Sequence, residues 1–555
     1  MSYLKQQSKR RAPQSAPIPG SDQVPNSTGG FAWAVDDWVR LRRFLILGSE
    51  GGSYYAGEWK LTRESAEAVE RCLADDGART VAEIVAISDA GRAPKNDPAI
   101  FALAIAAGAG DEQTRKAALE ALPRVCRTAT HLFQFVTFVE GFRGWGRSLR
   151  RAVGCWYADR SPESLAYQAV KYRQREGMTH RDVLRLAHPA ASVSAGNPTL
   201  ELGDEHRRLF EWIARGGAVE GLPRIVTGFT LVQSADSPTR AAELVREYGL
   251  PREAVPSELL ASAEVWAALL EDMPMTALVR SLATMTRVGV VAPGSAGTTK
   301  VLEQLGDGER VRKARVHPIA LLAALRTYAA GRGVRGRHSW TPVAQIVDAL
   351  DAAFYTAFEN VEPTGKRLLL ALDVSGSMTS GFVAGVPNLP PRDASAALAL
   401  VTAATESRYE TVGFFAGKRG WKSPTRSRRQ GFTDGLTPLR ISPRQRLDDV
   451  VRTIADLAFG GTDCALPMRY ALDCEREIDT FVIYTDSETW AGDIHPAHAL
   501  ADYRRASGID ARLVVVGMVS NGFSIADPND PGMLDVVGFD TATPQLVSDF
   551  ARGAL

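Results

Sequence analysis

The sequence is poor in cysteine, almost neutral and free of long apolar runs. Its five cysteines among 555 residues include no C-x-x-C pair, which argues against a disulfide framework and a structural zinc site and suits a reducing compartment. The net charge of +1 means that affinity for nucleic acid would need a local cluster of positive charge. Its apolar runs, such as residues 101–108 and 513–519, fall far short of the ~18 residues that a membrane helix needs. Because the basic N-terminus leads into prolines rather than an apolar segment, we expect a cytoplasmic protein with no membrane partner.

Three stretches of the chain differ in composition and periodicity, and the first two precede residue 361. Residues 1–30 are rich in Gln, Ser, Pro and Gly, which predicts a flexible basic tail, either an arm that follows RNA or a plain solvated terminus. Residues 31–360 repeat apolar side chains at a spacing near 3.6 and contain no convincing alternating strand. The clearest helical segments are 64–73, 114–122, 130–142, 240–248 and 318–330. So long a succession of helices favours stacked helix pairs, as in a HEAT-like solenoid.

The third stretch, residues 361–555, begins with a linker at 361–366 and then alternates apolar strands with helices. The strand candidates are 367–372, 411–416, 480–485 and 512–519. Helical segments lie between them at 391–406, 444–459 and 496–507. Strands of continuous apolar character that alternate with helices predict an α/β fold with a doubly wound, Rossmann-like parallel sheet.

A candidate metal site follows the first of these strands. Asp373, Ser375 and Ser377 form the pattern D-x-S-x-S directly after it, at the edge where parallel sheets bind ligands. Thr462, after a Gly-Gly pair, and Asp486, at the end of a later strand, add two oxygen donors from other loops. Hard oxygen ligands from three loops suit Mg²⁺. The simpler alternative is a cap-and-turn motif at an ordinary strand–helix junction.

The residues around this site favour binding over catalysis. Asp373 stands where the elbow of a serine hydrolase needs glycine, so Ser375 is not expected to act as a nucleophile. We find no His or Cys cluster near the motif and no second carboxylate cluster for two-metal chemistry. For His495 and His498, on a nearby loop and helix start, we expect exposed structural roles, the alternative being that they support the metal ligands. We therefore predict no catalytic residue and no enzymatic activity.

Residues 141–188 concentrate positive charge in an otherwise neutral chain. They contain ten Lys and Arg residues against four Asp and Glu residues, and aromatic residues are interleaved with them. The cations are Arg143, Arg147, Arg150, Arg151, Arg160, Lys171, Arg173, Arg175, Arg181 and Arg185. The aromatic residues are Phe142, Trp145, Trp156, Tyr157, Tyr167 and Tyr172. Such groups can contact phosphates and stack on unpaired bases, although the solvated faces of amphipathic helices would give the same composition.

Helix signals place part of this charge on a helix that begins near residue 162. Ser161 and Pro162 are a typical cap and first residue, and Gly177 is a typical end. Lys171 and Arg175 are four residues apart, so we expect them to share one face of this helix.

A second helix is expected to follow at once. Thr179 and Asp182 resemble a capping box. Arg181, Arg185 and His188 then fall at positions i, i+4 and i+7, on one face. The two helices together would present neighbouring basic stripes.

Several segments resemble the Ro60/TROVE family. The basic part of the likeness is 171–188 (KYRQREGMTHRDVLRLAH) and 144–147 (GWGR). The likeness continues in 315–328 (RVHPIALLAALRTY), 360–378 (NVEPTGKRLLLALDVSGSM), 460–468 (GGTDCALPM), 484–492 (YTDSETWAG) and 518–539. The five oxygen donors also resemble the metal-ion-dependent adhesion site of von Willebrand A domains. The likeness covers most of residues 31–550 and both parts of the chain in the family's order.

The resemblance implies a specific architecture and specific ligands. Residues 31–360 would form a closed ring of HEAT-like repeats, the TROVE domain, and residues 361–555 a von Willebrand A domain whose metal site often accepts a carboxylate from a partner protein. Small noncoding Y RNAs would bind the outer basic surface, and single-stranded ends of misfolded or immature RNA would enter the central hole. Lys171, Arg175 and His188 match the family's RNA-binding residues.

The resemblance also implies a cellular role. The Ala- and Arg-rich composition favours a bacterial member, and such proteins resemble adaptors joined through Y RNA to the exoribonuclease polynucleotide phosphorylase, in ribosomal RNA maturation, RNA quality control and stress-linked decay. One departure concerns Met178 and Thr179, because many relatives have an aromatic residue and Ser there, so stacking at Met178 is not expected. The alternative function is a metal-dependent protein-interaction module with an incidental basic surface.

Overall fold

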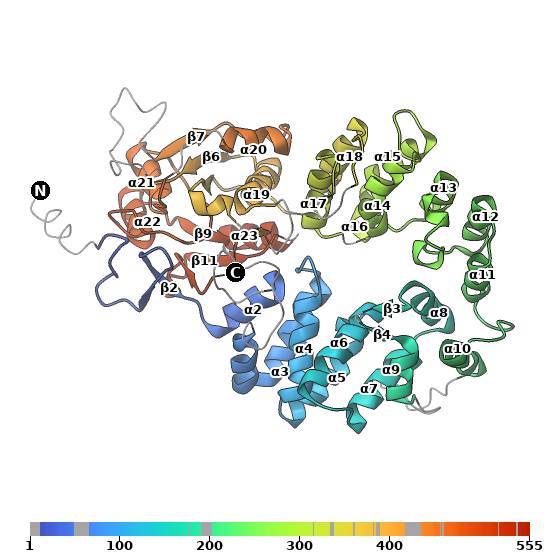
Figure 1. The fold of residues 1–555 in the computed structure, drawn as a ribbon. Coiled ribbons are helices and arrows are strands. Elements are labelled where there is room, and N and C mark those ends of the chain that lie inside the picture. The colour runs from blue at the N-terminus through green and yellow to red at the C-terminus, as the bar shows by residue number, and fades with distance from the viewer. Residues whose placement is uncertain are drawn as a thin grey trace, which may run out of the picture.

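A computed structural model describes most of the chain as a helical part followed by an α/β part (Figure 1). The described residues are 12–48, 66–175, 177–189, 203–314, 316–333, 338–358, 361–380, 382–383, 389–416, 435–455, 457, 460–519, 521–539 and 542–554.

The helical part contains helices α2 to α18 and two short strands. They are α2 (Asp37–Leu47), α3 (Glu67–Ala90), α4 (Asp97–Ala109), α5 (Glu112–Val125), α6 (Ala129–Phe142), α7 (Arg147–Ala158), α8 (Pro162–Lys171), β3 (Gln174–Arg175), β4 (Met178–Thr179), α9 (His180–Ala187), α10 (Asp204–Arg215), α11 (Arg224–Gln233), α12 (Pro238–Tyr248), α13 (Ala263–Glu271), α14 (Met275–Arg287), α15 (Ala296–Gly306), α16 (Gly308–Lys313), α17 (Pro318–Ala329) and α18 (Ala344–Thr356).

Local sequence signals set the ends of many of these helices. Asp111 caps α5 by accepting a hydrogen bond from the Thr114 amide. At α12, Ser237 is the N-cap and Pro238 the first helical residue, and Gly249 ends the helix in the left-handed region with φ 61°. These are the residue types that satisfy or replace the unpaired backbone groups at helix ends, which is why the periodic segments could be recognised in the sequence.

The helices pack in succession and close into a ring. Helices that are consecutive or alternate along the chain pack against one another, in pairs such as α3 with α5, α12 with α13 and α17 with α18. The two ends of the array meet where His317 Nε2, at the start of α17, donates a hydrogen bond to the carbonyl oxygen of Arg92, 3.1 Å away, between α3 and α4. Figure 1 shows the resulting ring of helices, with the α/β part beside this junction. This confirms the predicted HEAT-like ring.

The α/β part is built on a six-stranded sheet with the order β11-β9-β8-β5-β6-β7. Its strands are β5 (Leu368–Asp373), β6 (Tyr409–Phe414), β7 (Leu436–Leu439), β8 (Thr480–Thr485), β9 (Arg512–Gly517) and β11 (Met533–Val537). Its helices are α19 (Pro391–Thr405), α20 (Leu447–Ala455), α21 (Leu466–Asp473), α22 (Pro496–Ser507) and α23 (Ala542–Arg552).

Apolar residues of β5 alternate between the two faces of this sheet. Leu368, Leu370 and Leu372 belong to the core on the α19 side, whereas Leu369 and Ala371 belong to the core on the α21 and α22 side. Helices therefore cover both faces, as the continuous apolar strands predicted.

The sheet is mixed rather than wholly parallel, which corrects one detail of the prediction. Edge strand β7 runs antiparallel to β6. Its Pro438, opposite Val412, is tolerated because an edge strand need not donate every ladder hydrogen bond. Sequence analysis also missed β7 and β11, since both are short and only partly apolar.

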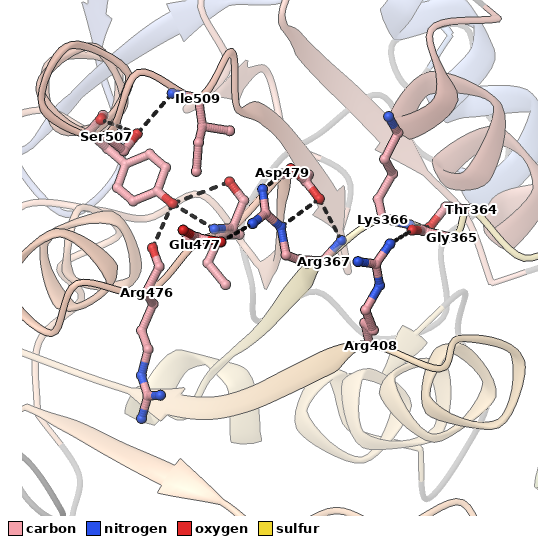
Figure 2. A network of polar contacts seen from close by, with 12 residues as sticks. Thr364, Gly365, Lys366, Arg367, Arg408, Arg476, Glu477, Asp479, Ser507 and Ile509 are labelled. Carbon is pink, nitrogen blue, oxygen red and sulfur yellow. Dashed lines mark hydrogen bonds and ion pairs between the residues drawn. The ribbon is translucent and has the colours of Figure 1, made fainter.

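The start of β5 is held by ion pairs and hydrogen bonds (Figure 2). The Arg367 side chain donates to both carboxylate oxygens of Asp479, at 2.9 and 2.6 Å, and its backbone amide donates to the same carboxylate at 2.8 Å. The Arg367 guanidinium holds the pKa of Asp479 below its ordinary value. In the preceding linker, Thr364 donates through its amide and hydroxyl to Glu406.

Residues 12–34 do not form the free tail that was predicted for residues 1–30. They lie against the α/β part, where β1 (Gln23–Pro25) pairs with β2 (Phe31–Ala34) and β2 pairs with β10 (Phe523–Ser524). We call residues 12–34 the N-terminal strap. The prediction for residues 1–11 lies outside the described residues. The strap also explains a second correction, because His495 is fully buried beneath it rather than exposed.

Within the described residues, the longest helix, α3, and all the others are too short or too polar to cross a membrane.

Candidate metal centre and basic surface

The D-x-S-x-S loop curls at the carboxyl end of the central strand β5. Asp373 is fully buried, and its carboxylate accepts hydrogen bonds from the Ser375 amide at 2.9 Å and the Thr485 hydroxyl at 2.6 Å. The hydroxyl oxygens of Ser375 and Ser377 lie 3.0 Å apart. Three oxygen-bearing side chains of the predicted set thus gather in one turn.

The other two predicted donors lie on loops beside this turn. Asp486 follows β8, is almost fully buried and accepts a hydrogen bond from the Glu488 amide at 3.0 Å. Burial, and secondly the nearby charge of Asp486, raise the pKa of Asp373. Thr462 is buried two residues before Cys464, whose thiol lies 3.7 Å from the Thr485 hydroxyl.

This donor set fits a hard divalent cation. Two neighbouring buried carboxylates repel each other and favour a compensating positive charge. Among the described residues, no Lys, Arg or His forms an ion pair with Asp373. No group of three His, Cys, Asp or Glu side chains gathers anywhere in the described ranges, so the hydroxyls of Ser375, Ser377 and Thr462 are needed to complete the set. Mg²⁺ accepts such oxygen ligands and retains several waters.

Two residues that contact these loops were missed by sequence analysis. Gln14 of the strap donates to Asp463, 2.7 Å away, and Asn521 donates to the carbonyl oxygen of Asp486. Asn521 in turn accepts a hydrogen bond from Arg43 of α2. No local pattern marks either residue, because each partner lies far away in the sequence.

The basic stretch adopts a different local structure from the one predicted. Helix α8 ends at Lys171, and Arg175 lies on β3 of a short hairpin whose turn contains Gly177 at φ 75°. Lys171 and Arg175 therefore do not share a helix face. Strand β3 begins three residues after the end of α8. The Lys171 ammonium donates a hydrogen bond to the Tyr167 hydroxyl at 3.0 Å.

The second predicted helix is confirmed as α9. Thr179 and Asp182 form the reciprocal capping box, and Val183, Leu184 and Ala187 are buried. Arg181 and Arg185 are exposed on the opposite face. His188 is exposed just past the helix end, in the left-handed region with φ 44°.

The remaining candidates, Arg143 and Arg147, lie exposed where α6 ends and α7 begins. None of the seven candidates forms an ion pair with a described acidic residue. They are Arg143, Arg147, Lys171, Arg175, Arg181, Arg185 and His188. By contrast, Arg240 and Arg246 of α12 pair with Glu243 and Glu271, at 2.8 and 2.7 Å.

Two of the predicted stacking residues are not available for bases. Trp156 and Tyr157 are fully buried, and the Trp156 indole donates to the carbonyl oxygen of Cys126 at 2.6 Å. Trp145 and Tyr172 are partly exposed. The aromatic contribution to the surface is therefore smaller than composition indicated.

Comparisons with known proteins cover both parts of the chain. A family model described as the TROVE domain matches residues 24–215 and 250–326, and one described as the Ro60 vWA domain matches residues 367–551. The chain is 41% identical to the RNA-binding protein RO60 of Deinococcus radiodurans, over 96% of each protein. It is 36% identical to the RNA-binding protein RO60 of Caenorhabditis elegans, over 98% of this chain and 92% of that protein.

A solved structure agrees with these matches. The crystal structure of Deinococcus radiodurans RO (RSR) protein matches with a TM-score of 0.70 and 40% identity, covering 94% of this chain and all of that one. The helical ring, the mixed sheet and the sequence matches lead to one conclusion: the chain belongs to the Ro60 family, with a TROVE domain followed by a von Willebrand A domain.

Proposed function

We propose that this protein is a non-catalytic RNA-binding scaffold that holds structured noncoding RNA of the Y RNA class on the surface formed by the α6–α7 junction, the end of α8, the β3–β4 hairpin and α9. The supporting observation is that the seven exposed or half-exposed basic side chains of this surface have no described acidic partner, so their charge is available to phosphates. The curated relatives are named RNA-binding proteins.

Finer parts of the proposal come from the family resemblance. Single-stranded ends of misfolded or immature RNA, including ribosomal RNA, would enter the ring. Y RNA would join the protein to polynucleotide phosphorylase for RNA maturation, quality control and stress-linked decay. Sequencing the RNA and identifying the proteins that copurify from the native host tests this part, and an RNA-free preparation with no nuclease partner would contradict it.

Salt-dependent binding of a small hairpin-containing RNA tests the basic surface. Lys171→Ala combined with Arg175→Ala removes two phosphate contacts, so we expect weaker binding and a salt slope that falls by about 0.9 per lost contact. Gel-shift titrations between low and moderate salt measure both quantities.

A matched control uses two arginines of the same ring. Arg240→Ala combined with Arg246→Ala removes the same charge from exposed residues that are already paired with carboxylates. We expect almost no change in affinity or slope. Equal losses in the two double variants would show that only net charge matters and would refute this surface.

We also propose that the von Willebrand A domain binds Mg²⁺ through Asp373, Ser375, Ser377, Thr462 and Asp486, and that the bound ion accepts a carboxylate of an acidic protein ligand. Phe382 and Trp490 support a partner-binding face. They are two of the three exposed large apolar side chains within the described residues. Trp490 donates its amide to the carbonyl oxygen of Thr462 at 3.1 Å, and Phe382 follows Ser377 by five positions.

Removal of one carboxylate tests the metal centre. Mg²⁺ binds only the folded protein, so 100-fold excess over its Kd should stabilise the protein by about 2.7 kcal/mol. Asp373→Ala should abolish this stabilisation, because the remaining donors carry too little charge. Urea titrations with and without Mg²⁺ measure the effect, and equal stabilisation of both proteins would contradict the assignment.

The alternative function, a metal-dependent protein-interaction module with an incidental basic surface, makes opposite predictions. Asp373→Ala would then abolish the principal partner contact, and the Lys171/Arg175 double variant would be silent. RNA sequencing of material that copurifies with each variant separates the two.

A further inference from the structure

The N-terminal strap contacts the loops that carry two of the five proposed metal ligands. These loops are 460–463, which contains Thr462, and 486–492, which contains Asp486. The strap comes from the opposite end of the chain and was expected to be solvated. Figure 1 shows it (dark blue) against the red elements of the α/β part.

All of the polar atoms of Gln14 form hydrogen bonds, either to these loops and the nearby Ile494 or, through its backbone carbonyl oxygen, to the Phe31 amide of the strap. Its side-chain amide nitrogen donates to Asp463 Oδ1 and to the carbonyl oxygen of Ile494, both at 2.7 Å. Its amide oxygen accepts a hydrogen bond from the Thr489 hydroxyl. Its backbone amide donates to Gly492 at 2.9 Å. The side chain is fully buried, so each lost partner would leave a buried polar group unsatisfied.

A second part of the strap, the turn at residues 26–30, contacts the 486–492 loop at Thr489. Asn26 donates to the carbonyl oxygen of Thr489 at 2.7 Å, and its Oδ1 accepts the Gly30 amide at 2.8 Å. Gly30 lies so close that a Cβ there would sit 1.8 Å from the Thr489 carbonyl oxygen. Only glycine permits this approach.

The held loop is joined directly to the metal loops. The amides of Trp490 and Ala491 both donate to the carbonyl oxygen of Thr462 at 3.1 Å. Asp463, the Gln14 partner, is the residue after Thr462. A movement of residues 489–492 would therefore move Thr462, and Asp486 begins the same loop.

We propose that the N-terminal strap is part of the metal centre and that Gln14 is a positioning residue, which holds the Thr462 and Asp486 loops in the arrangement that binds a divalent cation. Gln14 itself does not ligate the ion. The inference rests on the proposed metal centre, and its consequence is that metal affinity depends on a segment more than 400 residues away along the chain.

The test uses the full-length protein and two probes, Mg²⁺ measured by calorimetric titration and Mn²⁺ measured by its paramagnetic signal. Gln14→Ala should weaken both by about tenfold or more, the usual effect of losing a group that orients metal ligands. Amide hydrogen exchange should also quicken at Trp490 and Ala491, a readout that requires no metal.

Gln304→Ala is the matched control. Gln304 is a buried glutamine of α15 that donates to the carbonyl oxygen of Leu270 at 3.1 Å, far from the metal loops. Its loss should lower stability without changing either metal affinity. Should Gln14→Ala fail to fold, Asn26→Ala is measured in the same way with the same expectation. This substitution removes the hydrogen bond from Asn26 to the Thr489 carbonyl oxygen.

The outcomes separate this inference from the proposed function. If the wild-type protein binds neither Mg²⁺ nor Mn²⁺, both the proposed metal centre and the proposed role of the strap are refuted. If the wild type binds, Asp373→Ala does not, and Gln14→Ala keeps full affinity and slow exchange, only the strap inference is overturned. An equal loss of affinity in Gln304→Ala would also overturn it, because the effect would then be general destabilisation.

Discussion

At the scale of single residues, His180 is a buried base beneath the basic surface. Its ring nitrogens contact the Tyr157 hydroxyl at 3.0 Å and the Gln168 carbonyl oxygen at 3.3 Å, and its ring meets the edge of Phe133. Burial lowers its pKa to about 4. The folded state therefore keeps a neutral imidazole that the unfolded chain would protonate near pH 6.5.

The stability of the protein should depend on the charge state of His180. Because the folded pKa is depressed, the unfolded chain binds more protons between pH 6.5 and about 4, and the free energy of unfolding falls as pH decreases through that window. Between pH 7.5 and 5 this residue should account for about 2 kcal/mol. Urea titrations of the wild type and His180→Gln at both pH values measure the difference.

The exposed His338 supplies the control for this prediction. His338→Gln should show the same pH dependence as the wild type. If His180→Gln also retained the full wild-type slope, another group would be responsible for the acid sensitivity.

At the scale of elements, α9 is a short helix whose start depends on its capping box. Thr179 Oγ1 accepts the Asp182 amide at 3.2 Å, and the Asp182 carboxylate accepts the Thr179 amide at 3.0 Å. The helix has eight residues, too few to be stable alone. The cap and the buried side chains therefore decide whether Arg181 and Arg185 point into solvent.

Loss of this cap should be measurable. Thr179→Ala removes the acceptor for an amide at the helix start and should lower the free energy of unfolding by about 1 kcal/mol. Thr179→Ser keeps the hydroxyl and should stay within a few tenths of the wild type. Thermal or urea unfolding distinguishes the two, and equal stability of all three proteins would show that packing alone positions α9.

The elements that sequence analysis recognised differ physically from those that it missed. Long periodic helices and the apolar strands β5, β6, β8 and β9 carry their pattern in their own residues. The β3–β4 hairpin has two residues per strand, and β7 is an edge strand that contains proline. Such elements form because neighbouring elements accept their hydrogen bonds, and that information is not local.

At the scale of the whole molecule, Arg43 joins the helical ring to the α/β part. Its side chain is 2% exposed, forms an ion pair with Asp535 of β11 at 2.7 Å and donates to the carbonyl oxygens of Asn521 and Phe523. Asn521 also bonds to the loop of Asp486. The ring, the sheet edge and the candidate metal centre thus meet at one guanidinium.

Removal of this guanidinium should be costly. Arg43→Met leaves the Asp535 carboxylate without its ion-pair partner and should lower the free energy of unfolding by about 3–5 kcal/mol. The neighbouring Arg42 pairs with Glu83 at a half-exposed site, so Arg42→Met should cost less than about 1 kcal/mol. Urea unfolding followed by tryptophan fluorescence compares them, and similar small losses would mean that the interface is held by apolar contacts.

The sequence by itself determined what depends on neighbouring residues: the helix periods and caps, the apolar strands, and the D-x-S-x-S turn with Thr462 and Asp486 after other elements. It could not determine which distant segments would meet. Only tertiary structure decided three features of the molecule. They are the contact of the strap with the metal loops, the hydrogen bonds from Arg43 to Asn521, and the helix end that separates Lys171 from Arg175. The physical reason is that these buried polar groups need partners supplied by packing, across separations such as the 449 residues between Gln14 and Asp463.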